Sequence, residues 1–165
     1  MNSQADRQTR DLLIAGLRGK GAHLSLETAV ANFPESLMNE RPPNVPYTFW
    51  HQLEHIRIAQ EDLYHYSTNS GAGSPPWPEG YWPKADATAD TAEWERTVAA
   101  IQADRDRFIA LLDAPTTDIY EAKDYMDGGS IFRAALLAID HTAYHIGEFV
   151  MGRQILGHWS SRLDQ

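Results

Sequence analysis

The chain contains 165 residues, with 14 lysines and arginines against 23 aspartates and glutamates, a formal net charge of −9, seven histidines and no cysteine. The length suits one domain, expected over residues 1–165, and the lack of cysteine excludes disulfides, thiolate metal sites and a cysteine nucleophile. The acidic charge argues against a nucleic-acid partner. The sequence has no apolar run of about 18 residues and no apolar signal segment, so we expect no membrane contact and a cytoplasmic location.

Long proline-free stretches carry apolar residues at helical spacing, and none alternates as strands do. Ser25, Thr48 and Ser130 are suited to cap helices because their hydroxyls accept bonds from free backbone N–H groups. Gly19 and Pro34 interrupt the first part of the chain. The sequence therefore predicts an all-α four-helix bundle, with long helices over residues 5–17, 48–66, 90–112 and 131–156 and a short helical piece over 25–32.

Residues 67–89, between the second and third long helices, form the longest stretch without helical spacing. This stretch contains prolines, glycines and the aromatic residues Trp77, Tyr81 and Trp82. A linker exposed to solvent would be polar throughout, so the aromatics favour a packed loop that acts as a lid. The alternative is a loop that only covers one end of the core.

The last long helix places three polar residues on an otherwise apolar stripe, which also includes Leu137, Phe149 and Ile155. His141 and His145 are four residues apart, so both rings lie on one face, and Glu148 lies one turn further on. This spacing lets a helix present two ligands to one metal. Glu148 is then a ligand, a general base or a hydrogen-bonding partner of a ligand. The alternative is a pair of hydrogen-bonded core histidines without metal.

A metal site needs at least a third ligand, and the second long helix offers candidates. His55 projects at the margin of its apolar face, whereas His51 lies further round, nearer the charged side. His55 is therefore the better candidate, although either or both remain open at this point. His65 is expected to be solvated.

The opposite side of the last helix carries a second apolar stripe. A helix that is apolar on two sides is buried on two sides. A homodimer would bury the extra face, unless the short 25–32 segment or the long loop covers it. The stripe consists of Phe132, Ala135, Leu136, Ile139, Ala143, Ile146 and Val150.

Three segments together resemble the DinB-like (YfiT-like) family of four-helix-bundle metalloproteins. They are PYTFWHQLEHIRIAQEDL, WPEGYWP and GGSIFRAALLAIDHTAYHIGEFVMGRQILG. The resemblance implies a mononuclear divalent metal bound by His55, His141 and His145, and a dimer formed through the helices. Relatives often carry glutamine at the position of Glu148, and commonly no histidine at that of His51.

Zinc or nickel is expected first, with iron, cobalt or copper as alternatives, because histidine nitrogen suits all of them. The resemblance implies a metal-dependent enzyme acting on a small molecule, either a thiol-dependent S-transferase or isomerase, or a hydrolase. A low-molecular-weight thiol would come from a cosubstrate, since the chain has no cysteine. The alternatives are a non-catalytic metal-binding or small-ligand-binding stress-response module, and a purely structural bundle.

Overall fold

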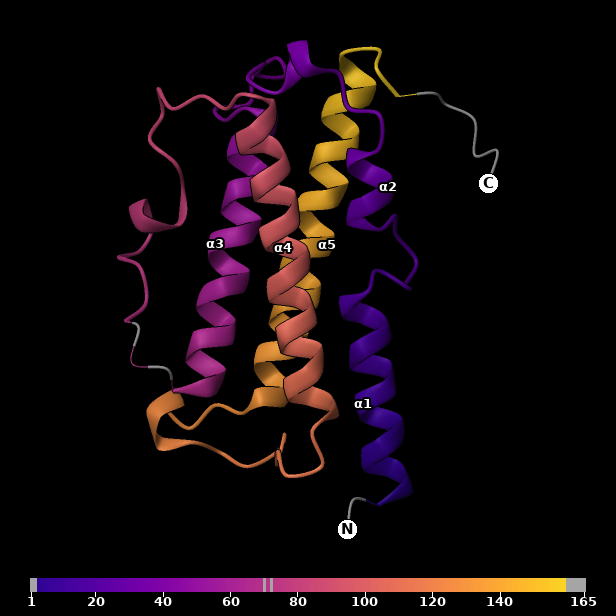
Figure 1. The fold of residues 1–165 in the computed structure, drawn as a ribbon, viewed down its shortest axis with the longest axis vertical. Helices are drawn as coiled ribbons and strands as arrows, with labels where there is room; N and C mark the ends of the chain where they lie inside the picture. Colours follow the sequence, from indigo (N-terminus) through magenta and orange to yellow (C-terminus); the bar gives the residue numbers. More distant parts are fainter. Residues whose placement is uncertain (1–2, 70, 72, 160–165) are drawn as a thin grey trace.

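The computed structural model describes residues 3–69, 71 and 73–159, and their regular secondary structure is entirely helical. Figure 1 shows the helices and their connections. They are α1 (Gln4–Leu17), α2 (Leu26–Val30), α3 (Phe49–Thr68), α4 (Thr91–Asp113) and α5 (Ile131–Ile155), with short 3-10 turns at Glu35–Leu37, Glu79–Tyr81 and Asp124–Met126. The predicted all-α bundle of four long helices is confirmed.

The helices begin at residues whose side chains complete the hydrogen bonding of the first turn. Ser25, Thr48 and Ser130 each accept a bond from the backbone N–H three residues further on, as predicted. Asp90 does the same for α4. Helix α3 ends at Thr68, two residues later than predicted. The residue that caps it, Asn69, has a φ of 51°, a left-handed conformation that asparagine tolerates.

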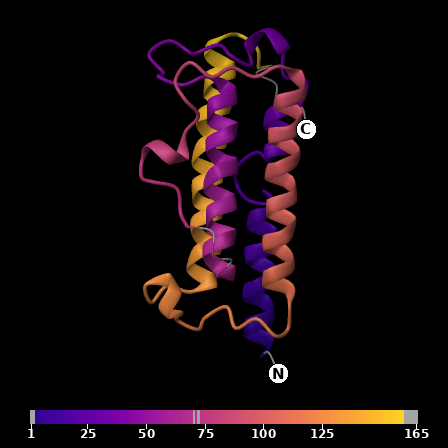
Figure 2. The ribbon, with the colours of Figure 1, turned by 60° about the vertical axis from the view of Figure 1, so that its left-hand side comes forward.

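The order of the helices in space depends on the long connection after α3. α1 and α2 lie end to end along one edge of the bundle (Figure 1). α3 and α4 run in the same direction, and α5 runs opposite to both. A parallel pair needs a connection that returns along the bundle, and the described part of residues 69–90 does so on the outside, beside α3 (Figures 1 and 2).

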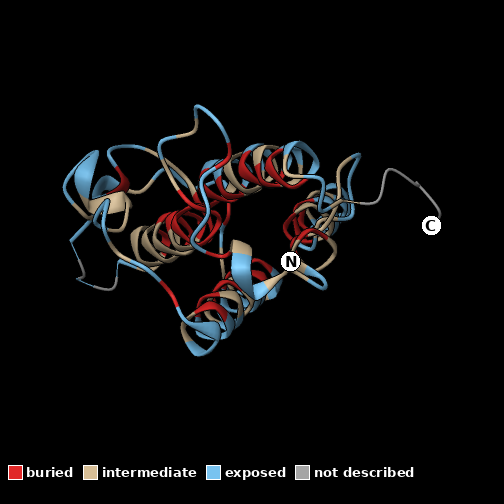
Figure 3. Cartoon of the chain, turned by 90° about the horizontal axis from the view of Figure 1, so that it is seen from above, coloured by how far each residue is buried: buried red, intermediate tan, exposed pale blue. Residues whose placement is uncertain are grey.

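Two apolar clusters fill the bundle, one near each end. Seen from above, the buried faces of the long helices point toward one another (Figure 3). One cluster joins α1, the end of α4 and the start of α5, with Leu13, Phe108, Leu112 and Ile131 among its members. The other joins the starts of α3 and α4 to the end of α5, with Phe49, Ile56, Trp94 and Phe149 among its members. The middle of α3 and α5 lies between these clusters.

A buried arginine ties α1 to the end of α4. The side chain of Arg10 is 2% exposed and donates to the Asp6 carboxylate at 2.8 Å. It also donates to the backbone carbonyls of Leu112, Ala114 and Thr117. These carbonyls end α4 or follow it, so Arg10 satisfies acceptors that lack a partner within the helix.

Helix α5 is covered on two sides by the chain itself. α1 and α2 pack against it, and Ala135 and Ile146 of its second apolar stripe are buried. Leu137 and Ile155, expected on the inward stripe with the histidines, are instead exposed, so the projection was wrong at these two positions. None of the described helices, α5 included, combines the length and apolar character needed to cross a membrane.

Candidate metal centre

Three histidines from two helices meet in the middle of the bundle. His55 lies on α3, and His141 and His145 lie one turn apart on α5, which packs directly against α3. One ring nitrogen of each histidine lies within 4.8 Å of a ring nitrogen of each of the other two. Within the described residues, no other group of three or more metal-ligating side chains lies so close together. The structure therefore juxtaposes the three histidines that the resemblance assigns as ligands.

The tautomer of His55 is set by the connection between α3 and α4. Its Nδ1 lies 2.7 Å from the carbonyl oxygen of Tyr81. A carbonyl only accepts hydrogen bonds, so Nδ1 carries the proton and donates it. In the neutral ring the lone pair is then on Nε2, which faces Nε2 of His141 at 3.0 Å.

The tautomer of His145 is set by Glu148, one turn further along α5. His145 Nδ1 lies 2.8 Å from Glu148 Oε2 and donates to it. The lone pair of the neutral ring is then on Nε2. Histidines that bind metals usually donate their other N–H to a carboxylate or carbonyl, which orients the ring. His55 and His145 both have such a partner.

The three rings are held in the neutral form that metal binding requires. Burial, together with the neighbouring His145 and His55, lowers the pKa of His141 to about 4. Burial also lowers the pKa of His55 and that of His145. At neutral pH the cluster is therefore a set of uncharged nitrogen donors.

Glu148 is the charged group beside the cluster. Its Oε2 accepts bonds from the Tyr47 hydroxyl at 3.1 Å and the Gln52 amide at 3.0 Å, in addition to His145. Burial raises the pKa of this carboxyl, but hydrogen bonds from Tyr144, His145 and Tyr47 outweigh burial and hold the pKa below its ordinary value. Glu148 is thus ionised at neutral pH. Because it hydrogen-bonds to His145, its position suits a residue that orients a metal ligand better than it suits a metal ligand itself.

The aromatic part of the long connection covers the cluster. Trp82 stacks face to face on His55, with ring centroids 3.9 Å apart and an interplanar angle of 3°. The Tyr81 hydroxyl donates to Asp62 of α3 at 2.7 Å, which fastens this segment to the helix. Trp77 is 76% exposed and does not take part. Of the predicted loop aromatics, Tyr81 and Trp82 therefore form the cover of the site.

The donor set fits a divalent transition metal. Two nitrogen ligands about 2.0–2.1 Å from a zinc ion in tetrahedral geometry lie about 3.4 Å apart. The 3.0 Å between Nε2 of His55 and Nε2 of His141 is close to this separation. Uncharged imidazole donors suit zinc, nickel, iron, cobalt or copper. Three protein ligands also leave further coordination positions for small molecules.

Two other histidines of α3 lie outside the cluster. His51, expected nearer the charged side, is buried, because its Nε2 donates to the Ala87 carbonyl at 2.8 Å and its Nδ1 accepts the Thr48 backbone N–H at 3.5 Å. It completes the N-terminal cap of α3 and anchors the segment before α4. His65, expected to be solvated, is half-buried. Periodicity could not show either result, since both depend on the path of loops over α3.

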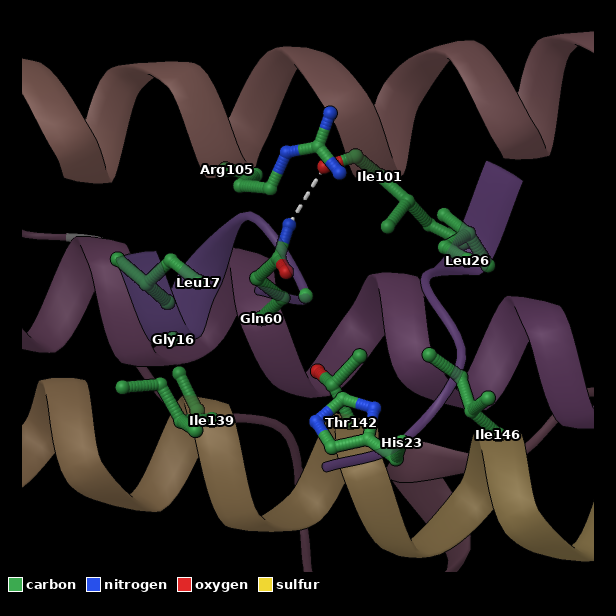
Figure 4. Close-up of a pocket in the computed structure, with 12 residues that line it drawn as sticks. Gly16, Leu17, His23, Leu26, Gln60, Ile101, Arg105, Ile139, Thr142 and Ile146 are labelled. Carbon is green, nitrogen blue, oxygen red and sulfur yellow. Dashed lines mark hydrogen bonds between the residues drawn. The ribbon is translucent and has the colours of Figure 1, made fainter. Parts of the chain in front are cut away.

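A small cavity among α1, α3, α4 and α5 offers no room for a substrate (Figure 4). Its volume is about 20 Å³, little more than a single water molecule occupies. Gln60 points into it and donates to the Ile101 carbonyl at 2.6 Å.

A model of the DinB superfamily matches residues 22–149. The match extends from before α2 into the last turns of α5 and contains the three histidines and Glu148. No match was found among curated proteins or among solved structures.

Proposed function

The chain belongs to the DinB superfamily, and from its three converging histidines we propose that it is a metal-dependent enzyme acting on a small molecule. The observation that carries the proposal is the pair of set tautomers. His55 and His145 each donate Nδ1–H to a fixed acceptor, which leaves Nε2 free as a ligand atom. The free Nε2 of His55 lies 3.0 Å from Nε2 of His141, and one ring nitrogen of each of the three histidines lies within 4.8 Å of the others, as a shared metal ion requires.

Each residue of the site has a distinct part in this proposal. His55, His141 and His145 hold the metal, which supplies Lewis acidity when bound. Glu148 keeps the proton of His145 on Nδ1 and orients the ring. Trp82 covers one face of His55 and keeps water from it. Zinc or nickel is the expected metal, with iron, cobalt or copper as alternatives.

The proposed reaction class is transfer or isomerisation with a low-molecular-weight thiol, or hydrolysis. The chain has no cysteine, so the sulfur in a thiol reaction must arrive on a cosubstrate. Both classes need an open coordination position, and a three-histidine site leaves one. Glu148 is the ionised group closest to the cluster and is the proposed base if a proton must be removed.

The experiment is a metal analysis of untagged protein by mass spectrometry after incubation with each divalent metal. The wild-type chain is expected to bind one equivalent, and His145→Ala is expected to lose it. His158→Ala is the matched control, because this histidine is exposed and outside the cluster. Equal metal content in wild type and His145→Ala would refute the assignment.

A non-catalytic metal-binding module is the second candidate, supported by the stacked cover of Trp82 over the site. The two candidates differ in access to the metal. Addition of a small thiol to cobalt-loaded protein is expected to change the visible spectrum if a coordination position is open. An unchanged spectrum would favour the non-catalytic module.

We also propose that the chain forms a homodimer. α1 and α2 cover part of the second stripe of α5, but Leu136, Leu137 and Tyr144 of this helix stay exposed. A second copy would bury them. Size-exclusion chromatography with light scattering is expected to give twice the chain mass, and a monomer at micromolar concentration would refute the dimer.

A further inference from the structure

A second concave site lies beside the histidine cluster, between the segment that precedes α3 and the end of α5. It is lined by residues of 42–52 and of 148–155, and its volume is about 180 Å³. We call it the α5 groove. None of the three clustered histidines lines it. A cavity of about 150 Å³ with apolar walls can hold benzene, so this groove has room for a group of that size.

The walls of the α5 groove are apolar. Pro42, Val45 and Phe49 form one side, and Met151 and Ile155 form the other. Met151 is 61% exposed and Ile155 56% exposed, so two large apolar side chains face water at the rim. Contact with an apolar ligand would remove this surface from water, which is favourable by about 25 cal/mol per Å² of apolar surface.

The floor of the α5 groove is closed by a tight helix contact. A Cβ atom on Gly152 would lie 3.0 Å from both Phe49 and Pro42. The glycine therefore lets the backbone of α5 approach the 42–49 segment closely.

The polar end of the α5 groove accepts hydrogen bonds. Tyr47 and Gln52 line it together with Glu148, and both of their side chains donate to Oε2 of the Glu148 carboxylate. His145 donates to the same oxygen from the other side. An ionised carboxylate has acceptor capacity on both oxygens. The Tyr144 hydroxyl also donates to this carboxylate, and because Tyr144 is 62% exposed a ligand can replace it there. The Glu148 side chain itself is 31% exposed.

We propose that the α5 groove is a binding site for a small ligand with an apolar group about the size of a benzene ring and a cationic amino or amidino group that binds Glu148. A ligand with a carboxylate or phosphate at that end would meet the Glu148 charge and be repelled. The net charge of −9 also favours a cation. The α5 groove needs no metal to form, so this inference goes beyond the proposed enzyme and can be tested in the metal-free protein.

The experiment is a titration of metal-free protein with benzylamine, benzyl alcohol and benzoate, followed by calorimetry and by amide chemical shifts. Benzylamine is expected to bind about tenfold more tightly than benzyl alcohol, because a hydrogen bond to a charged partner is the stronger kind. Benzoate is expected not to bind. The shift changes should fall in residues 42–52 and 148–155.

Two variants locate the ligand within the α5 groove. Met151→Trp fills the rim and is expected to abolish binding, while Leu12→Trp, an exposed position of α1 outside the groove, is expected to bind as wild type does. Glu148→Gln should reduce the affinity for benzylamine to that for benzyl alcohol. Unaltered binding by Met151→Trp, or equal affinity for benzylamine and benzoate, would overturn the proposal. Metal content, measured on the same variants before the metal is removed, reports separately on the proposed enzyme.

Discussion

Replacement of Glu148 with alanine tests whether a hydrogen bond outside the histidine cluster controls metal binding. Glu148 Oε2 accepts from His145 Nδ1 at 2.8 Å, a distance typical of a charge-assisted bond. Bonds to charged groups contribute about 1.5–3 kcal/mol. Without the carboxylate, His145 can shift its proton to Nε2, the nitrogen proposed to bind the metal. We therefore expect metal affinity to fall about 10–100-fold, the range found for such partners of ligands.

The assay is competition for the metal with a chelating dye, on untagged protein. Glu148→Gln, whose amide oxygen can accept the same bond, is expected to lose less affinity than Glu148→Ala. Glu95→Ala is the matched control, because Glu95 is exposed on α4 and distant in the fold from the cluster. If Glu148→Ala folds as wild type does and binds metal within twofold of it, the orienting role assigned to Glu148 is wrong.

Three further predictions follow from the buried groups. In metal-free protein the free energy of unfolding should fall as the pH drops from 7 to about 4. In the unfolded chain His141 takes up a proton near the ordinary histidine pKa of 6.5, whereas in the folded chain it does so only near 4. Protonation between these values therefore favours the unfolded chain. Urea titrations that give equal stability across this range would contradict the assignment, and His141→Asn should show a smaller slope. Arg10→Ala should destabilise the chain by about 3–5 kcal/mol, because it leaves Asp6 and several carbonyls without their partner. Thermal unfolding measures this loss, and Arg96→Ala, at an exposed position, is the control expected to change little. A loss below about 1 kcal/mol for Arg10→Ala would contradict the prediction. Trp82→Ala should increase hydrogen exchange in the backbone of residues 79–84, because the stack of Trp82 on His55 contributes about 0.5–1.5 kcal/mol. Unchanged exchange would mean that the stack does not hold this segment against α3.

Local physics explains which parts of the fold could be predicted from the sequence. Capping and helical periodicity act over a few residues, so Ser25, Thr48 and Ser130 located the helix starts correctly. The side of α3 that carries His55 also follows from periodicity, which is why His55 ranked ahead of His51. The projection of α5 was wrong at Leu137 and Ile155, which are exposed. The parallel course of α3 and α4 could not be predicted, because it depends on the path of a loop that has no period.

Contacts between segments that are distant in the chain could not be predicted from the sequence for the same reason. Tyr47 and Gln52 meet Glu148 across about a hundred positions, and nothing in their local pattern points to a carboxylate. Gln52 lies one turn before His55 on α3, the one signal that could have placed it near the site. The burial of His51 likewise depends on the Ala87 carbonyl, which a helical projection does not contain.

The contact between the long connection and His55 has a thermodynamic consequence. The Tyr81 carbonyl and the Trp82 ring act on the same imidazole that is proposed to bind the metal. If the docked connection raises the affinity for metal by some factor, bound metal must favour the docked connection by that same factor, because coupling between two equilibria is reciprocal. A molecule that displaces the connection would therefore loosen the metal without touching it, and the occupancy of the centre would report on what lies against the outside of the bundle.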